Sequence, residues 1–255
     1  MPPRQPGSSS LGQPDYWWYR ARTDLLREVF EPSVGRPRRI LDVGSADAPS
    51  VGWLHGDHAR VTLDLFPDGL VPGEGVCGSA MALPFADQVF DVVCAFDVVE
   101  HCEDDVLAMS ELTRVLAPGG RVLLSVPAYQ WAWSDHDVRA GHHRRYTRPR
   151  LRELVAGAGL RVTRATYAFG AVFPLFLAER MARRLRGSAG PASQSRLPSV
   201  SPSADRILMT LSALDRRLLR RWDLPVGSSV FVAATKPEQE TLPGRSVPAP
   251  RSPVR

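Results

Sequence analysis

The chain of 255 residues has only three cysteines, a single lysine and no long apolar run. An odd number of cysteines, two of them in or beside apolar segments, argues against a disulfide framework and for reduced thiols in the cytoplasm. No apolar stretch approaches the roughly 20 residues that a membrane-spanning helix needs. The first residues, MPPRQPGSSSLGQP, lack the apolar core of a secretion signal, so we expect a disordered tail over 1–14 and a cytoplasmic protein.

Because Lys236 is the only lysine, nearly all positive charge is carried by arginine. The net charge of +5 is unevenly placed, since residues 172–224 hold ten arginines against four acidic residues and the remainder is about neutral. A general nucleic-acid surface needs basic residues spread over its binding face. The local excess therefore argues against a nucleic-acid partner and marks 172–224 as a distinct segment.

Apolar runs alternate with helical periodicities over the rest of the chain. The run Phe90 to Phe96 is apolar except for Asp91, the pattern of a central strand covered on both faces. Helical patterns separate the strands, and the helix that ends before 117 is followed by a turn, APGG. Alternating strands and helices predict a doubly wound, mostly parallel α/β sheet. We expect strands at 38–43, 59–65, 75–77, 90–96, 121–126, 160–168 and 228–235, and helices at 15–30, 103–116, 147–159 and 203–222.

Acidic residues stand at the ends of three expected strands: Asp42, Asp64 and Asp97. Ligands of such sheets bind beyond the carboxyl ends of the strands, where the strand order reverses. In ILDVGSADAP, the first strand breaks at Gly44 into a turn of small residues, against which a ligand can lie close to the backbone. These positions together predict one shared binding site.

Four motifs in order, LDVGSADAP, LDL, GSAMALPFADQVFDVVCAFDVVEH and RVLAPGGRVLLSVP, resemble those of class I S-adenosylmethionine-dependent methyltransferases of the small-molecule subgroup. The resemblance covers Ile40 to Arg161. It implies a methyltransferase with a Rossmann-like, seven-stranded sheet whose last strand is antiparallel. The expected organisation is a helix or lid at 15–37, a core at 38–171 and 225–236, a basic helical insertion at 172–224 between strands six and seven, and a disordered tail at 237–255.

The resemblance also implies how the cofactor, S-adenosylmethionine, is bound. Asp42 and Gly44 would lie against its methionine part, and Asp64 would accept both ribose hydroxyls. Its adenine and sulfonium would be contacted by Leu65, Ser79, Ala80, Met81 and the backbone of Phe96. The chain departs from the family at Ala46 and Ala48, where glycine is usual, and at Ser79, where aspartate is usual. An inactive scaffold or binding protein with this fold therefore stays open, as does a nucleic-acid methyltransferase, although an Asn/Asp-Pro-Pro-aromatic motif is absent.

Three histidines are candidates for the catalytic step: His101, His136 and His142. Methyl transfer from a sulfonium is an in-line displacement, so the protein aligns the reactants and removes a proton from a hydroxyl acceptor. His101 follows the fourth strand, and its ordinary pKa suits a base at neutral pH. A structural role in ordering the loop fits His101, and its neighbour Glu100, as well.

A long segment rich in functional groups, SVPAYQWAWSDHDVRAGHHRRYTR, follows the fifth strand. Long loops of this kind usually carry function. Arg144 and Arg145 either hold an anionic acceptor through paired hydrogen bonds or pair with Asp135 and Asp137 to fix the loop. No helical histidine pair or cysteine partner supports a metal site, so none is expected.

Two further segments bear on partners. In YWWYRAR, Arg20 or Arg22 would meet the cofactor carboxylate, unless the aromatic residues only anchor the first helix. The helix over 203–222 is typical of a membrane surface or of a hairpin packed on the domain or on a second copy in a homodimer. The first alternative predicts contact at the inner face of a membrane, where a lipid-linked acceptor would be reached. The expected acceptor is a small molecule or a lipid- or glycan-linked compound that is methylated at oxygen. The apolar stripe of this helix is Ile207, Leu211, Leu214, Leu218 and Trp222.

Overall fold

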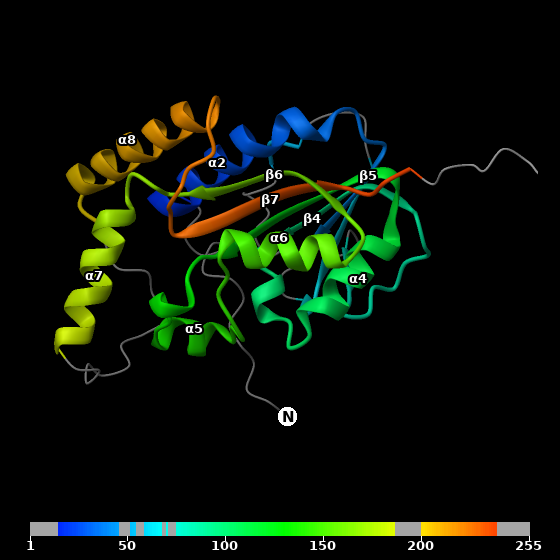
Figure 1. Cartoon of the computed structure of the whole chain (residues 1–255), viewed down its shortest axis with the longest axis horizontal. Helices are drawn as coiled ribbons and strands as arrows, with labels where there is room; N and C mark the ends of the chain where they lie inside the picture. The colour runs from blue at the N-terminus through cyan, green and yellow to red at the C-terminus, as the bar shows by residue number, and fades with distance from the viewer. Residues whose placement is uncertain are drawn as a thin grey trace, which may run out of the picture.

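Seven strands form one sheet in the order β3-β2-β1-β4-β5-β7-β6 (Figure 1). The computed structural model describes residues 15–45, 52–54, 59–67, 70, 75–186 and 200–238; the expected tails at 1–14 and beyond 238 lie outside them. Neighbours run parallel from β3 to β5, and β7 runs antiparallel to both β5 and β6. The predicted fold is confirmed. The strands are β1 (Arg39–Val43), β2 (Ala59–Asp64), β3 (Gly75–Cys77), β4 (Phe90–Phe96), β5 (Leu116–Pro127), β6 (Arg161–Ala168) and β7 (Ser229–Thr235).

The central strand β4 is buried along its length except at Asp91, which is half-buried. The Asp91 carboxylate accepts hydrogen bonds from the backbone N–H groups of Arg38 (2.7 Å) and Arg39 (3.0 Å). The acidic residue that interrupts the apolar run therefore fixes the start of β1 beside β4. The strand order reverses between these two strands, so their carboxyl ends form the crevice in which such sheets bind ligands.

Helices cover both faces of the sheet (Figure 1). On one face lies α2 (Trp17–Val34), whose Phe30 stacks on Phe96 and on Phe231 with ring centroids 5.6 Å apart in each pair. On the other face lie α4 (Asp105–Val115) and α6 (Arg148–Gly157). As the sequence predicts, Thr147 caps α6, because its hydroxyl accepts a hydrogen bond from the N–H of Arg150 at 3.4 Å.

Strand β5 begins at Leu116, five residues before the expected start at 121, because the APGG segment stays within the sheet. Leu116 pairs with Phe90, and pairing resumes at Arg121, so residues 117–120 form an irregularity in the ladder. The N–H of Gly119 donates to the carbonyl of Lys236, and the N–H of Lys236 donates to the carbonyl of Gly120, both at 2.9 Å. These two hydrogen bonds keep the APGG turn attached to the end of β7.

The insertion between β6 and β7 contains α7 (Phe173–Arg186) and α8 (Pro202–Leu219), which lie at the same end of the molecule (Figure 1). Acidic and basic side chains of α2 neutralise part of the charge of α8. The expected apolar stripe supplies only part of the covered face of α8: Leu211 and Leu218 pack against the core, whereas Ile207, Leu214 and Trp222 are 59%, 46% and 62% exposed. None of the helices in the described ranges is long and apolar enough to cross a membrane. The ion pairs between α2 and α8 are Arg20–Asp205 (2.5 Å), Asp24–Arg216 (3.4 Å) and Glu28–Arg220 (3.1 Å).

Candidate functional site

The carboxyl ends of β1 and β2 bring together three residues predicted to bind the cofactor: Asp42, Gly44 and Asp64. The two carboxylates are 3% and 9% exposed. Gly44 has a φ of +74°, and its N–H donates to the carbonyl of Leu63 at 2.7 Å. A Cβ atom on Gly44 would lie 2.4 Å from Cγ2 of Val98. The turn therefore requires glycine both for its backbone conformation and for its close approach to the segment after β4.

The predicted adenine side of the site lies at the turn after β3. The N–H of Gly78 donates to the carbonyl of Asp64 at 2.9 Å, which ties this turn to the end of β2. The hydroxyl of Ser79 accepts a hydrogen bond from the N–H of Met81 at 3.1 Å, so Ser79 shapes the turn. Around it lie the other predicted adenine contacts, the exposed Leu65 and the half-buried Ala80 and Met81. The departures Ala46 and Ala48 fall outside the described residues.

At the end of β4, the buried Phe96 is followed by Asp97, whose φ of +56° is uncommon for a residue other than glycine. The Asp97 carboxylate lies 2.7 Å from Nη2 of Arg22 and accepts a hydrogen bond from the hydroxyl of Ser125 at 3.2 Å. Arg22 comes from α2 and is 1% exposed. Of the two arginines predicted to reach the cofactor, Arg22 lies at the strand ends, whereas Arg20 pairs with α8.

Glu100 lies in the short 3-10 helix η3 (Val99–His101) directly after the end of β4. Its side chain is fully buried, and neither carboxylate oxygen has a hydrogen-bond partner among the described residues. Burial raises the pKa of Glu100 well above its usual range, and the charge of Asp97 raises it further. Its backbone carbonyl accepts the N–H of His143 at 2.7 Å. Glu100 thus has the expected structural role through its backbone, while its carboxyl group is left unpaired.

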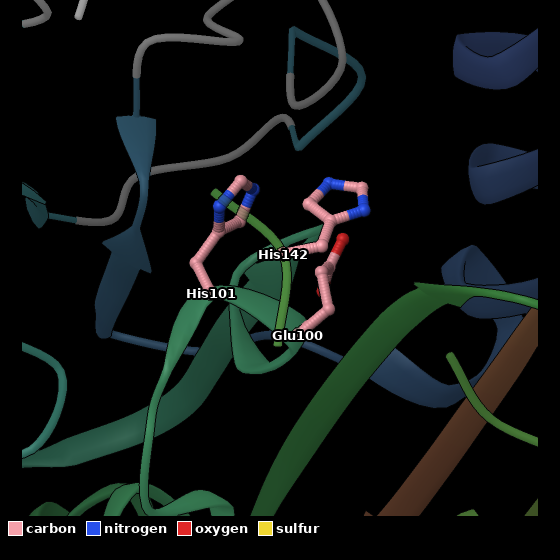
Figure 2. Close-up of side chains that lie close together, drawn as sticks. All are labelled: Glu100, His101 and His142. Carbon is pink, nitrogen blue, oxygen red and sulfur yellow. The ribbon is translucent and has the colours of Figure 1, made fainter. Parts of the chain in front are cut away.

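The structure brings the three candidate histidines into one cluster around His142. The rings of His101 and His142 lie nearly perpendicular, with centroids 4.6 Å apart, and Figure 2 shows them beside Glu100. The ring of His136 lies 6.3 Å from that of His142. The side chain of His101 is partly exposed. Burial of the rest of the side chain is the main cause, and the proximity of His142 the second, that lowers the pKa of His101 to about 4. Burial also lowers the pKa of His136. His101 is therefore neutral at pH 7.

A single buried aspartate, Asp137 of α5 (Asp135–Ala140), fixes both His142 and Arg145. Its carboxylate accepts two hydrogen bonds from Arg145 (2.7 and 3.0 Å), one from Nδ1 of His142 (2.8 Å) and one from the N–H of Ser134 (2.8 Å). Burial by itself would raise the pKa of Asp137, but the hydrogen bonds from His142 and Arg145 hold it well below its usual range. The ionised carboxylate therefore anchors the segment after β5.

Both neighbouring arginines of this segment are engaged in ion pairs within the chain. Arg145 pairs with Asp137, and Arg144 lies 3.0 Å from the carboxylate of Asp105. Both arginines therefore fix the loop, as one of the two alternatives predicts. Their partners are Asp137 and Asp105, whereas Asp137 and Asp135 were expected. The segment is also more regular than the expected loop, because it contains α5 and a short 3-10 helix, η4 (Gln130–Ala132).

An aromatic group that sequence reasoning did not assemble follows the end of β5. Its centre is Tyr129, which has a φ of +63°. The ring of Tyr129 lies 5.5 Å from that of Trp131, 5.3 Å from that of Tyr167 and 5.5 Å from that of Phe173, centroid to centroid. These four residues join the carboxyl ends of β5 and β6 to the start of α7. Of the four side chains only Trp131 is exposed, whereas Tyr167 is buried.

Comparisons with known proteins find methyltransferases. A family model described as a methyltransferase domain matches residues 41–124, which include the ends of β1, β2 and β4 but not His142 or the insertion. An uncharacterized methyltransferase of Mycobacterium tuberculosis is 32% identical over 174 residues, which cover 57% of this chain and 68% of that protein. A demethylmenaquinone methyltransferase of Mycobacterium bovis is 32% identical over 143 residues, which cover 51% of this chain and 58% of that protein. The chain thus spans about half the length of the demethylmenaquinone methyltransferases that it matches.

A crystal structure of a SAM-dependent methyltransferase from Archaeoglobus fulgidus has a similar fold. The two superpose with a TM-score of 0.55 at 17% sequence identity, and the match covers 89% of this chain and 98% of that chain. At this identity the likeness concerns the fold, and the coverage shows that it extends over nearly the whole of both chains.

Proposed function

Because this chain belongs to the class I S-adenosylmethionine-dependent methyltransferases, we propose that it transfers a methyl group from S-adenosylmethionine to an oxygen atom of an apolar, small-molecule or lipid-linked acceptor. The observation that carries the proposal is the meeting of Asp42, Gly44, Asp64 and Asp97 at the carboxyl ends of β1, β2 and β4, where the strand order reverses. When bound, S-adenosylmethionine supplies a methyl group on a positively charged sulfur.

The residues at the strand ends fit this cofactor. A carboxylate offers several acceptor positions, so the hydrogen bond that Asp64 accepts from the N–H of Phe66 at 3.0 Å is compatible with two ribose hydroxyls. Gly44 lets the methionine part approach the backbone, with Asp42 below it. Asp97 and Asp42 place negative charge near the positive sulfur and amino groups, and Arg22 is the candidate for the carboxylate. Leu65 and Met81 would enclose the adenine, next to Ala80 and the turn that Ser79 shapes.

The acceptor would lie between the histidine cluster and the aromatic group. Trp131, which is 39% exposed and has Tyr129 stacked against it, offers a flat apolar surface for an aromatic or greasy acceptor. His101 follows the end of β4 by a few residues, so its ring and that of His142 are the groups we assign to holding the acceptor hydroxyl and its proton. The ring of His136 lies farther from that of His142 than the ring of His101 does. Alignment of the acceptor oxygen behind the methyl carbon is the principal task of such a site.

Calorimetric titration with S-adenosylmethionine tests the cofactor assignment. We expect the Asp64→Asn variant to bind roughly tenfold to a hundredfold more weakly, because hydrogen bonds to a charged acceptor contribute about 1.5–3 kcal/mol. The Asp87→Asn variant is the control, since Asp87 precedes β4 and lies at the opposite end of the sheet. A wild-type chain that takes up no S-adenosylmethionine at millimolar concentration would instead favour the inactive scaffold.

Exposed apolar side chains on the insertion support a membrane surface as the source of the acceptor. The exposed apolar side chains are Ile207 and Leu214 on α8, Trp222 just after it, and Leu175, Leu177 and Met181 on α7. On and after α8 they are flanked by the exposed Arg206, Arg217, Arg220 and Arg221. An apolar face with flanking arginines suits an anionic membrane surface. The acceptor can be sought in an extract incubated with labelled cofactor and then separated into lipid and aqueous fractions.

Cosedimentation with vesicles of phosphatidylglycerol and phosphatidylcholine tests this contact. We expect the variant with Leu214→Ser and Trp222→Ser to bind the vesicles at least tenfold more weakly, since full burial of one such side chain contributes about 1.5–3 kcal/mol. Val106→Ser is the matched control, because Val106 on α4 is 64% exposed and lies outside the insertion. Equal sedimentation of both variants and the wild type would remove the membrane from the proposal.

A further inference from the structure

We propose that Glu100, His101 and His142 hold a divalent metal ion of the zinc class, in a site that the sequence alone did not lead us to expect. One ligand atom from each of the three residues lies within 4.8 Å of the others. Figure 2 shows Glu100 and His101 rising from η3 and His142 coming from the segment that crosses it. The binding of the ion stands on these contacts, and only its role rests on the function proposed above.

The donor set indicates which ion the site would take. Two imidazoles and one carboxylate favour zinc, iron or manganese over magnesium, which prefers oxygen ligands and water. A tetrahedral zinc with ligands at about 2.0–2.1 Å places those ligand atoms about 3.4 Å apart. The three groups therefore have to approach one another by roughly an ångström or more. Rotation of His101, the most exposed of the three, would supply much of that movement.

One ring nitrogen of His142 is already held by a carboxylate, as it is in metal sites. Its Nδ1 is hydrogen-bonded to Asp137 at 2.8 Å, which leaves Nε2 as the ligand atom. Metal-bound histidines nearly always donate their other ring N–H to a carboxylate or a carbonyl in this way. Asp137 is itself held by Arg145 and Ser134.

Glu100 supplies an independent indication of a cation. Its carboxyl group is fully buried, and neither oxygen has a donor within the described part of the chain. Buried polar groups in native proteins are almost always partnered, so such a pair of oxygens needs an explanation. The N–H of His143 holds the carbonyl of Glu100 at 2.7 Å, which keeps the two ligand segments together without the ion. A cation in the cluster would satisfy the carboxylate.

The position of the cluster indicates what the ion would do. Three protein ligands leave one coordination position open, as in catalytic zinc sites. Val98, two residues before Glu100, approaches Gly44, so the cluster follows directly on the segment that contacts the proposed cofactor turn. With both histidines coordinated, the ion would hold the acceptor hydroxyl in place of the two rings, and the hydroxyl would lose its proton to solvent water more readily. Its oxygen would then form the new O–CH3 bond, while the electron pair of the broken C–S bond stays on sulfur.

Titration of the chelator-treated, tag-free full chain with Co²⁺ tests the site, because tetrahedral Co²⁺ has a strong visible absorption. We expect one equivalent to bind per chain, and Glu100→Gln and His142→Ala to weaken binding at least tenfold to a hundredfold. His143→Ala is the matched control, since His143 is adjacent and exposed but not among the three ligands, and it should bind Co²⁺ like the wild type. Competition with Zn²⁺ should abolish the absorption.

Absence of Co²⁺ absorption in the folded wild-type chain, or unchanged binding in a folded His142→Ala variant, would overturn the metal site. The wild-type stoichiometry decides the question if a variant fails to fold. Calorimetry with S-adenosylmethionine on the chelated chain keeps the two proposals apart. Cofactor binding without Co²⁺ binding would refute the metal site and leave the methyltransferase function standing.

Discussion

The Asp137→Ala variant is expected to lose about 3–5 kcal/mol of the free energy of unfolding, because it leaves the buried guanidinium of Arg145 without its partner. The Asp137 side chain is fully buried and receives hydrogen bonds from Arg145, His142 and Ser134. For a chain of this size the loss corresponds to a fall in Tm of very roughly 10 °C. Denaturation in urea, followed by circular dichroism, measures the change.

Asp135→Ala is the matched control for this variant. Asp135 belongs to the same short helix but is exposed, so its replacement should change the free energy of unfolding by less than about 0.5 kcal/mol. Because the pKa of Asp137 is depressed in the folded protein, its contribution is present above pH about 4 and is lost as the pH falls through the folded-state value. A wild-type chain no more stable than Asp137→Ala at pH 7 would contradict the prediction.

The second large effect is expected at Gly44, where alanine should weaken S-adenosylmethionine binding by about a hundredfold or more. The φ of +74° costs a residue with a Cβ about 1–2 kcal/mol. The added atom would also meet Cγ2 of Val98 at 2.4 Å, and overpacking of this kind costs about 1–3 kcal/mol. We expect the turn to move so that the backbone strain and the clash with Val98 are relieved. The displaced turn then no longer fits the cofactor. Calorimetry of the folded variant measures the loss.

Gly35→Ala separates backbone strain from the loss of the site. Gly35 has a similar φ of +68°, but the nearest atom to its added Cβ is Nη1 of Arg121 at 3.8 Å. It should cost about 1–3 kcal/mol of stability and leave cofactor binding unchanged. Adding Val98→Ala to Gly44→Ala should restore part of the affinity, because it removes the clash and keeps the strain. Normal cofactor binding by a folded Gly44→Ala variant would place the cofactor elsewhere.

The strands were predictable because each is a short apolar run with a clear stop. The run Phe90 to Phe96 and the breaks at Gly44 and Gly159 are properties of neighbouring residues. The start of β5 was placed too late, because its first residues are held by Lys236, which arrives from the far end of the chain. The covered face of α8 could not be predicted either, because ion pairs with the acidic residues of α2 help to determine which side of α8 is covered.

In the candidate site, too, features set by neighbouring residues could be predicted, and features set by distant residues could not. Asp42, Asp64 and Asp97 could be placed at one edge because the ends of parallel strands coincide. The meeting of His101 with His142 could not, because it depends on how the segment after β5 folds back over η3, fixed by Asp137. The positive φ of Asp97 and of Tyr129 likewise has no local signal in the sequence. The ligand roles assigned to these residues stay predictions.

The place of β7 in the sheet has a consequence for how the protein is made. β7 lies between β5 and β6 and is the only strand that pairs with β6 among the described residues. During synthesis, β6 therefore waits without a strand partner until about 60 further residues, including α7 and α8, have been added. Pairing across such a separation is slow, and unpaired strand edges invite association between chains. The insertion thus sets the time during which the nascent chain is most in need of a chaperone.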